Sequence, residues 1–170
     1  MNDDNETYLL HQTPYELAKE LIKFCRIELG QRVVEPFRGE GAFYNNFPDI
    51  AIKDYSEIRQ GKDYKDLATN FDWVITNPPF QIEDEKKKLV NAFWPLLDYF
   101  TQHARAGVAF LGNDRCFSTL TPQRMAVLAS RGFHLSKVVL CGVKKWRGRY
   151  YFLIFEKKPN SFFEVLPKNY

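Results

Sequence analysis

The sequence predicts a single α/β domain, with a mostly parallel sheet, helices on both faces and a C-terminal antiparallel hairpin. Short β-branched, apolar runs alternate with segments of helical periodicity along most of the chain. Two of these runs end in glycine- or proline-rich turns, and the last two are joined by a short loop. A length of 170 residues suits one domain spanning 1–170, with 1–10 and 158–170 expected to be mobile ends.

The first half of the chain is expected to hold two helices and two strands. Thr13 can cap a helix that runs from Pro14 to Gly30. Its apolar positions recur at helical spacing: Leu17, Leu21, Phe24 and Cys25. Strands are expected over 32–35 and 50–54, with a short helix over 42–47 between them.

The second half continues the alternation. The expected elements are a strand over 71–76, a helix over 83–100 with a kink at Pro95, a strand over 107–111, a helix over 122–130 ended by Gly132, and hairpin strands over 135–141 and 150–156. The run Lys86-Lys87-Lys88 is expected on an exposed face of the long helix. Ligands of such sheets bind at the carboxyl ends of parallel strands, where Glu35 and Asn77 both fall.

The segment Asn77-Pro78-Pro79-Phe80 follows a predicted buried strand. Proline removes backbone donors and stiffens the chain, so a projecting turn is expected. The turn offers an amide, free carbonyls and an aromatic face at one point. This combination can hold a planar molecule that carries an exocyclic amine. The structural alternative is a proline-rich turn whose Phe80 fills the core.

A glycine loop follows the strand that ends at Glu35. Gly39 and Gly41 allow positive φ and close approach of the backbone to a ligand. Tyr44 stands where the dinucleotide fingerprint requires a third small residue. Glu35 would repel phosphate but suits an ammonium or sulfonium group. We therefore expect a nucleoside cofactor without phosphates.

Together these motifs resemble the S-adenosylmethionine-dependent amino-methyltransferases, especially the N6-adenine DNA methyltransferases. The stretch from Glu35 to Phe43 is similar to the family's first motif, and Asn77 to Phe80 to its catalytic motif. Thr13-Pro14, ahead of both, gives the motif order of the gamma-type enzymes. The resemblance implies a Rossmann-like methyltransferase fold, S-adenosylmethionine as cofactor and S-adenosylhomocysteine as product.

The resemblance also implies a set of site residues. The cofactor would contact Thr13, Glu35, Pro36, Phe37, Gly39, Gly41, Phe43, Glu57, Ile58, Asp63, Tyr64 and Asn77. The catalytic residues would be Asn77, Pro78, Pro79 and Phe80. Glu57 would accept from the ribose hydroxyls, with Asp54 as the rival, and Asp63 would accept from the cofactor's adenine amine. A solvated surface carboxylate is the alternative for each acid.

The implied chemistry is methyl transfer to an exocyclic amine, foremost N6 of adenine in DNA. The Asn77 side-chain oxygen and the Pro78 carbonyl would accept the amine's two protons, and Phe80 would stack on the base. Catalysis would be mostly positioning, without a metal. In duplex DNA the base would first have to flip out.

Substrate binding is expected near the last hairpin. The candidates are Phe80, Lys144, Lys145, Trp146 and Arg149. Basic residues beside an aromatic suit a phosphate backbone next to a stacking platform, although a basic hairpin without a ligand is a close alternative. Tyr151 or Phe152 could form another wall of the pocket. The loop 113–115 could also face the site.

The substrate stays open at this stage. The net charge of +3 leans only modestly toward nucleic acid. The chain leaves no room for a separate target-recognition domain, so a partner subunit could supply that function. RNA bases, protein glutamine and a non-catalytic partner role remain alternatives. Three widely spaced cysteines, no signal peptide and no membrane-spanning run favour the cytoplasm and no membrane partner.

Overall fold

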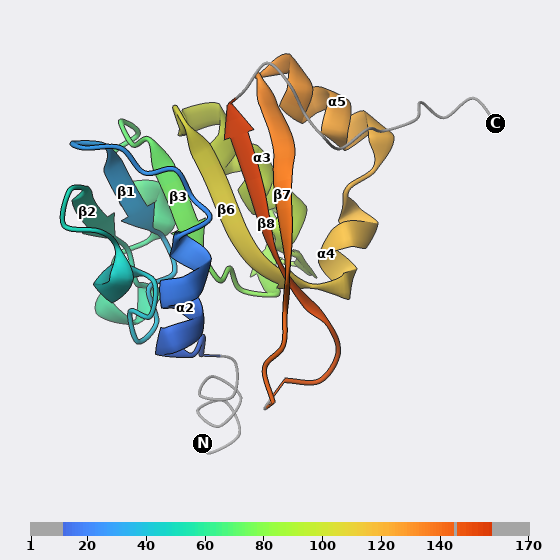
Figure 1. The fold of residues 1–170 in the computed structure, drawn as a ribbon. Helices are drawn as coiled ribbons and strands as arrows, with labels where there is room; N and C mark the ends of the chain where they lie inside the picture. Colours follow the sequence, from blue (N-terminus) through green and yellow to red (C-terminus); the bar gives the residue numbers. More distant parts are fainter. Residues whose placement is uncertain (1–11, 145, 158–170) are drawn as a thin grey trace.

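The computed structural model describes residues 12–144 and 146–157. They form a six-stranded sheet in the order β2-β1-β3-β6-β8-β7 (Figure 1). The strands are β1 (Arg32–Glu35), β2 (Ile52–Tyr55), β3 (Trp73–Thr76), β6 (Gly107–Asn113), β7 (Phe133–Cys141) and β8 (Tyr150–Lys157). The strands β2, β1, β3 and β6 pair in parallel, whereas β8 is antiparallel to both neighbours. The predicted sheet and its closing hairpin are confirmed.

Helices cover both faces of the sheet (Figure 1). Adjacent strand residues point to opposite faces. Val34 and Val74 therefore pack in one core cluster with α3 (Phe93–His103) and α5 (Pro122–Ser130). Val33 and Trp73 pack in a second cluster with α2 (Tyr15–Ile22). This two-sided packing is the predicted α/β arrangement.

The first two predicted helices are shorter than expected. The first, α2, ends at Ile22 rather than near Gly30, and its N-cap is Pro14 with no side-chain hydrogen bond, so the predicted cap by Thr13 is wrong. The expected helix over 42–47 is a single 3-10 turn, η1 (Tyr44–Asn46). There the Asn46 amide donates to the Ala42 carbonyl, a local side-chain bond that competes with continued helix.

The long helix predicted over 83–100 is also wrong in its first half. A separate hairpin, β4 (Gln81–Glu83) and β5 (Leu89–Asn91), occupies that stretch. Its turn forms because the Asp84 carboxylate accepts from the backbone N–H groups of Lys86 and Lys88. The lysine run is therefore exposed on a turn, not on a helix.

Helix α3 begins only at Phe93, so Pro95 lies in its first turn. A first-turn N–H has no helical partner to lose, so the expected kink does not follow. A short helix that the sequence did not indicate, α4 (Asp114–Thr119), follows β6 directly. The ends predicted to be mobile, 1–10 and 158–170, lie outside the described residues.

All three cysteines are free and buried. Within residues 12–144 and 146–157, no helix is long and apolar enough to cross a membrane.

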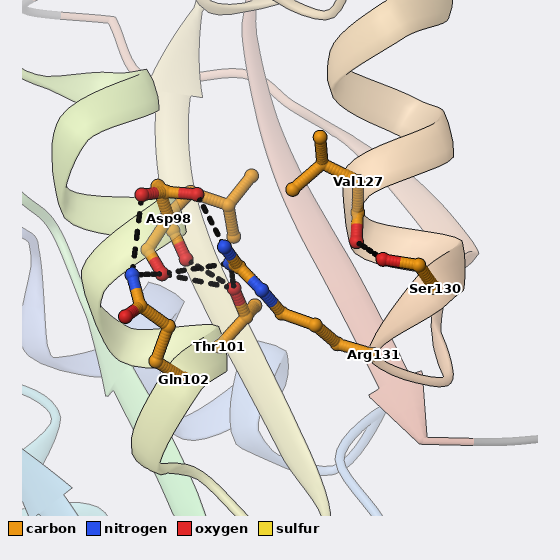
Figure 2. A network of polar contacts seen from close by, with 7 residues as sticks. Asp98, Thr101, Gln102, Val127, Ser130 and Arg131 are labelled. Atoms are coloured by element: carbon orange, nitrogen blue, oxygen red, sulfur yellow. Dashed lines mark hydrogen bonds and ion pairs between the residues drawn. The ribbon is translucent and has the colours of Figure 1, made fainter.

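The helices α3 and α5 are joined by one arginine, shown in Figure 2. Arg131, which caps α5, forms an ion pair of 2.9 Å with the Asp98 carboxylate. Its Nη1 also donates to the Asp98 carbonyl and to the Thr101 hydroxyl, each at 3.0 Å. Three contacts from one planar group orient the two helices on that face of the sheet.

We predict that Arg131→Met lowers the free energy of unfolding by about 1–2 kcal/mol, because it leaves a half-buried carboxylate without its partner. Chemical denaturation measures this directly. The matched control is Lys23→Met, which removes an exposed ion pair with Glu20 and should cost about 0.5 kcal/mol or less. Equal effects of the two substitutions would contradict a special role for Arg131.

Candidate active site

A cavity of about 650 Å³ opens at the carboxyl ends of β1 and β3. It is lined by Gln12, Thr13, Glu35, Pro36, Phe37, Arg38, Gly39, Ala42, Glu57, Ile58, Arg59, Lys62, Asp63, Tyr64, Asn77, Pro78, Pro79, Phe80, Gln81 and Ile82. The volume is within the ordinary range for a small-molecule site. The cavity thus brings the glycine loop and the Asn77-to-Phe80 segment together.

The glycine loop has the backbone geometry expected of it. Gly39 and Gly41 have φ of 51° and 80°, values that side chains disfavour. A Cβ on Gly39 would lie 2.6 Å from the Gln12 side-chain oxygen. The loop is tied to the end of β2 because the Gly39 N–H donates to the Glu57 carboxylate at 2.7 Å.

Glu35 ends β1 with its side chain buried and lining the cavity. Its carboxylate accepts from the Tyr44 N–H at 2.6 Å. Burial raises the pKa of Glu35 to about 8, although the backbone hydrogen bonds and the nearby Arg38 oppose the rise. A cationic ligand beside this carboxyl would favour its charged form.

Glu57 lies against the cavity, whereas its predicted rival Asp54 does not line it. The Asp54 carboxylate instead faces Arg32 across 3.7 Å. The Glu57 carboxylate accepts from the N–H groups of Gly39 and Arg59, one on each oxygen. These bonds hold the carboxylate at the cavity wall with further acceptor positions on the same oxygens.

The opposite part of the wall is aromatic and apolar. Tyr64 packs against Phe37, with ring centroids 5.4 Å apart. Asp63 caps the short turn η3 (Tyr64–Asp66) by accepting from the Lys65 N–H. Ile58, in the turn η2 (Ile58–Gln60), is 69% exposed beside the same cavity. An exposed isoleucine beside a tyrosine gives an apolar slot for a flat ring.

A second cavity, of about 430 Å³, adjoins the segment from Pro78 to Gln81. Pro78, Pro79, Phe80 and Gln81 line both cavities, while Asn77 lines only the first. The other lining residues of the second cavity are Asn91, Phe93, Leu111, Gly112, Asn113, Arg115, Cys116 and Tyr150. The proline segment is therefore a partition between two ligand-sized spaces.

Several predicted site residues lie elsewhere. Phe43 is fully buried and stacks on Phe152, so neither side chain faces the first cavity. Gly41 shapes the loop but does not line the cavity either. Tyr151, the other predicted wall residue, lines neither cavity, and its hydroxyl donates to Asp114.

The predicted basic stacking platform is not formed as expected. Trp146 is only 8% exposed and packs on Tyr150, so it cannot offer a free face to a base. Lys144 and Arg149 are exposed but line neither cavity, and Arg149 lies 3.5 Å from the Asp114 carboxylate. Lys145 lies outside the described residues.

Several residues that line the cavities were not predicted from the sequence, among them Ala42, Arg59, Lys62, Gln81 and Ile82 of the first cavity. Gln12 lines the first cavity and accepts from the Glu40 N–H, which no motif indicated. Arg38 lines it too, although its place inside the glycine loop could have indicated this. The loop 113–115 does reach the second cavity, through Asn113 and Arg115. In the described part of the chain, no cluster of His, Cys, Asp or Glu could hold a metal ion.

No family model matches the chain, and no curated protein matches it in sequence. Solved structures do match. TrmN from Thermus thermophilus has a TM-score of 0.60 and 17% identity, covering 88% of this chain and 51% of that chain. A modification subunit of a putative type I restriction enzyme from Vibrio vulnificus YJ016 has a TM-score of 0.61 and 14% identity. The match covers 86% of this chain and 44% of that chain.

The putative RNA methyltransferase PH1948 from Pyrococcus horikoshii has a TM-score of 0.61 and 19% identity, covering 88% of this chain and 89% of that chain. The chain thus spans about half the length of TrmN and of the modification subunit. Other matching structures contain bound S-adenosylmethionine or S-adenosylhomocysteine. The chain has the Rossmann-like methyltransferase fold.

The raised pKa of Glu35 predicts a pH-dependent stability. Between its ordinary value of 4.5 and about 8, the folded protein keeps a proton that the unfolded chain releases. Glu35 therefore contributes decreasing stability as the pH rises through this window. Glu35→Gln keeps an acceptor for the Tyr44 N–H but removes the titration.

We expect the free energy of unfolding of Glu35→Gln to rise relative to wild type between about pH 5 and about pH 8.5. Urea titrations across that range measure the difference. Parallel stability profiles for the two proteins would show that Glu35 titrates at its ordinary value.

Proposed function

We propose that the protein is an S-adenosylmethionine-dependent methyltransferase that methylates an exocyclic amine, N6 of adenine in DNA. The observation that carries the proposal is the partition from Asn77 to Phe80, with a cofactor-sized cavity on one side and a second cavity on the other. Group transfer needs two ligands that meet at one point, and this segment is where the two spaces adjoin.

The residues of the first cavity fit the cofactor. Glu35 suits its ammonium, and the Glu57 carboxylate suits the ribose hydroxyls. Ile58 and Tyr64 would face its adenine ring, with Asp63 as acceptor for the ring amine. When bound, the cofactor would supply a methyl group that is activated by a sulfonium. The leaving group would be the neutral thioether, S-adenosylhomocysteine.

The chain's own part in the chemistry is to orient the acceptor amine. The lone pair of adenine N6 is delocalised into the ring, so the amine is a poor nucleophile. The Asn77 side-chain oxygen and the Pro78 carbonyl would accept its two protons and localise the lone pair. The nitrogen gains the methyl group and releases one of these protons to solvent.

Phe80 supports the same assignment. It is 39% exposed and borders both cavities, which places its ring where a base in the second cavity would stack on it. Arg115 is exposed at the second cavity, where it suits the phosphates beside a flipped base. The similarity in fold to a restriction-enzyme modification subunit supports DNA as the substrate, and the motif resemblance favours the same substrate.

The test is transfer of a labelled methyl group from S-adenosylmethionine. Duplex DNA, single-stranded DNA, RNA and cell-extract protein are offered in parallel. We predict label in adenine of DNA, and a loss of about 100-fold or more in Asn77→Ala, because one preorganised hydrogen-bonding group at a reacting centre contributes about that much.

Asn70→Ala is the matched control, since Asn70 is exposed just before β3 and lines neither cavity. It should keep wild-type activity. Label in RNA or protein, still dependent on Asn77, would keep the chemistry and replace the substrate. Absence of any label, together with absence of cofactor binding in a thermal-shift assay, would instead favour a non-catalytic partner subunit.

A further inference from the structure

Arg38 occupies an unusual place, inside the glycine loop and at the wall of the first cavity. Its guanidinium lies over two tyrosine rings, 4.6 Å from the Tyr55 centroid and 5.3 Å from the Tyr44 centroid. The two rings come from β2 and η1 and contact each other, with centroids 5.0 Å apart. Cation–π contacts on two rings hold a side chain that would otherwise have many rotamers.

Arg38 forms no close ion pair among the described residues, although it lies near enough to the Glu35 carboxyl to lower the pKa of that carboxyl. Its Nε is buried without a hydrogen-bond partner. A buried, charged donor is unfavourable unless an acceptor completes it, and native proteins rarely leave one unmet. Arg38 is one of the residues that line the first cavity, so a ligand bound there can supply an acceptor to its guanidinium.

The carboxylates around the cavity restrict which anion fits. Glu35 and Glu57 line the same space as Arg38. Glu57 repels a purely anionic ligand such as a phosphate, and Glu35 does so when it is ionised. Arg38 in turn repels a purely cationic one. A zwitterion, with an ammonium and a carboxylate on one carbon, satisfies both sets of charges at once.

We propose that Arg38 binds the α-carboxylate at the amino-acid end of the cofactor, while Glu35 faces the ammonium. This inference rests on the proposed function, because it takes S-adenosylmethionine as the ligand. Arg38 makes the site selective for nucleosides that carry an intact amino acid. Its guanidinium offers paired donors that match the two oxygens of a carboxylate.

The test compares S-adenosylhomocysteine with its decarboxylated analogue, S-adenosyl-3-thiopropylamine, by titration calorimetry. Wild type should bind the analogue at least about tenfold more weakly, since a charged pair of hydrogen bonds is lost. Arg38→Met should weaken binding of S-adenosylhomocysteine by a similar factor. It should leave binding of the analogue nearly unchanged, so that the preference for the carboxylate disappears.

Two further variants separate this role from a structural one. Arg38→Lys keeps the charge and should restore part of the preference. Lys65→Met removes another cation, which is exposed, lies 5.7 Å from the Tyr64 ring and lines neither cavity. It should keep the full preference for the carboxylate.

The inference is overturned if wild type binds both ligands equally, or if Arg38→Met weakens both by the same factor. Loss of the preference in Lys65→Met but not in Arg38→Met would also overturn it. The wild-type comparison needs no variant, so it decides the matter even if a substitution impairs folding. Failure of wild type to bind either ligand would refute the proposed function itself, a result distinct from the others.

Discussion

The parallel pairing of β1 with β2 on one side and β3 on the other is the constraint on which the site depends. It brings the carboxyl ends of three strands together at one end of the sheet. Each strand continues into a segment whose side chains can bind a ligand. Glu35 ends β1, Glu57 follows β2 closely, and Asn77 follows β3. The hydrogen bond from the Gly39 N–H to Glu57 then couples the first two segments into one rigid wall.

Charge is balanced across this wall in an uncommon way. The cavity is lined by three carboxylates and three cations, which are Glu35, Glu57, Asp63, Arg38, Arg59 and Lys62. Burial keeps Glu35 mostly protonated below about pH 8, and two tyrosine rings lie against the guanidinium of Arg38. The opposite charges of these side chains offset one another in the free protein. A zwitterionic ligand would give both the carboxylates and the cations a partner of opposite charge.

Most of the fold follows from local patterns in the sequence. Most strands of the sheet are buried β-branched or aromatic runs, although the edge strand β2 is only partly buried. The glycine and proline signals place the strand ends within a few residues. The hairpin of β4 and β5 could not be foreseen, because its apolar residue Leu89 also fits one helical face with Phe93 and Leu96 of α3. What decides against a helix there is the Asp84 turn, a side-chain interaction that periodicity does not report.

The site was predictable where a motif fixes the backbone, as at Gly39 and Asn77. It was less so where packing decides the direction of a side chain. Trp146 sits in a basic segment that suits nucleic acid, yet the contact with Tyr150 turns it into the core. The second cavity combines residues from β5, β6, α4 and β8, so no stretch of sequence contains its signature.

The central claim is that the segment from Asn77 to Phe80 separates a cofactor space from an acceptor space. A crystal structure with S-adenosylhomocysteine tests it most directly. The account predicts the ligand in the first cavity, its amino-acid end between Glu35 and Arg38 and its adenine against Ile58 and Tyr64, with the second cavity left open. A ligand seated in the second cavity, or one whose adenine lies at the glycine loop, would contradict it.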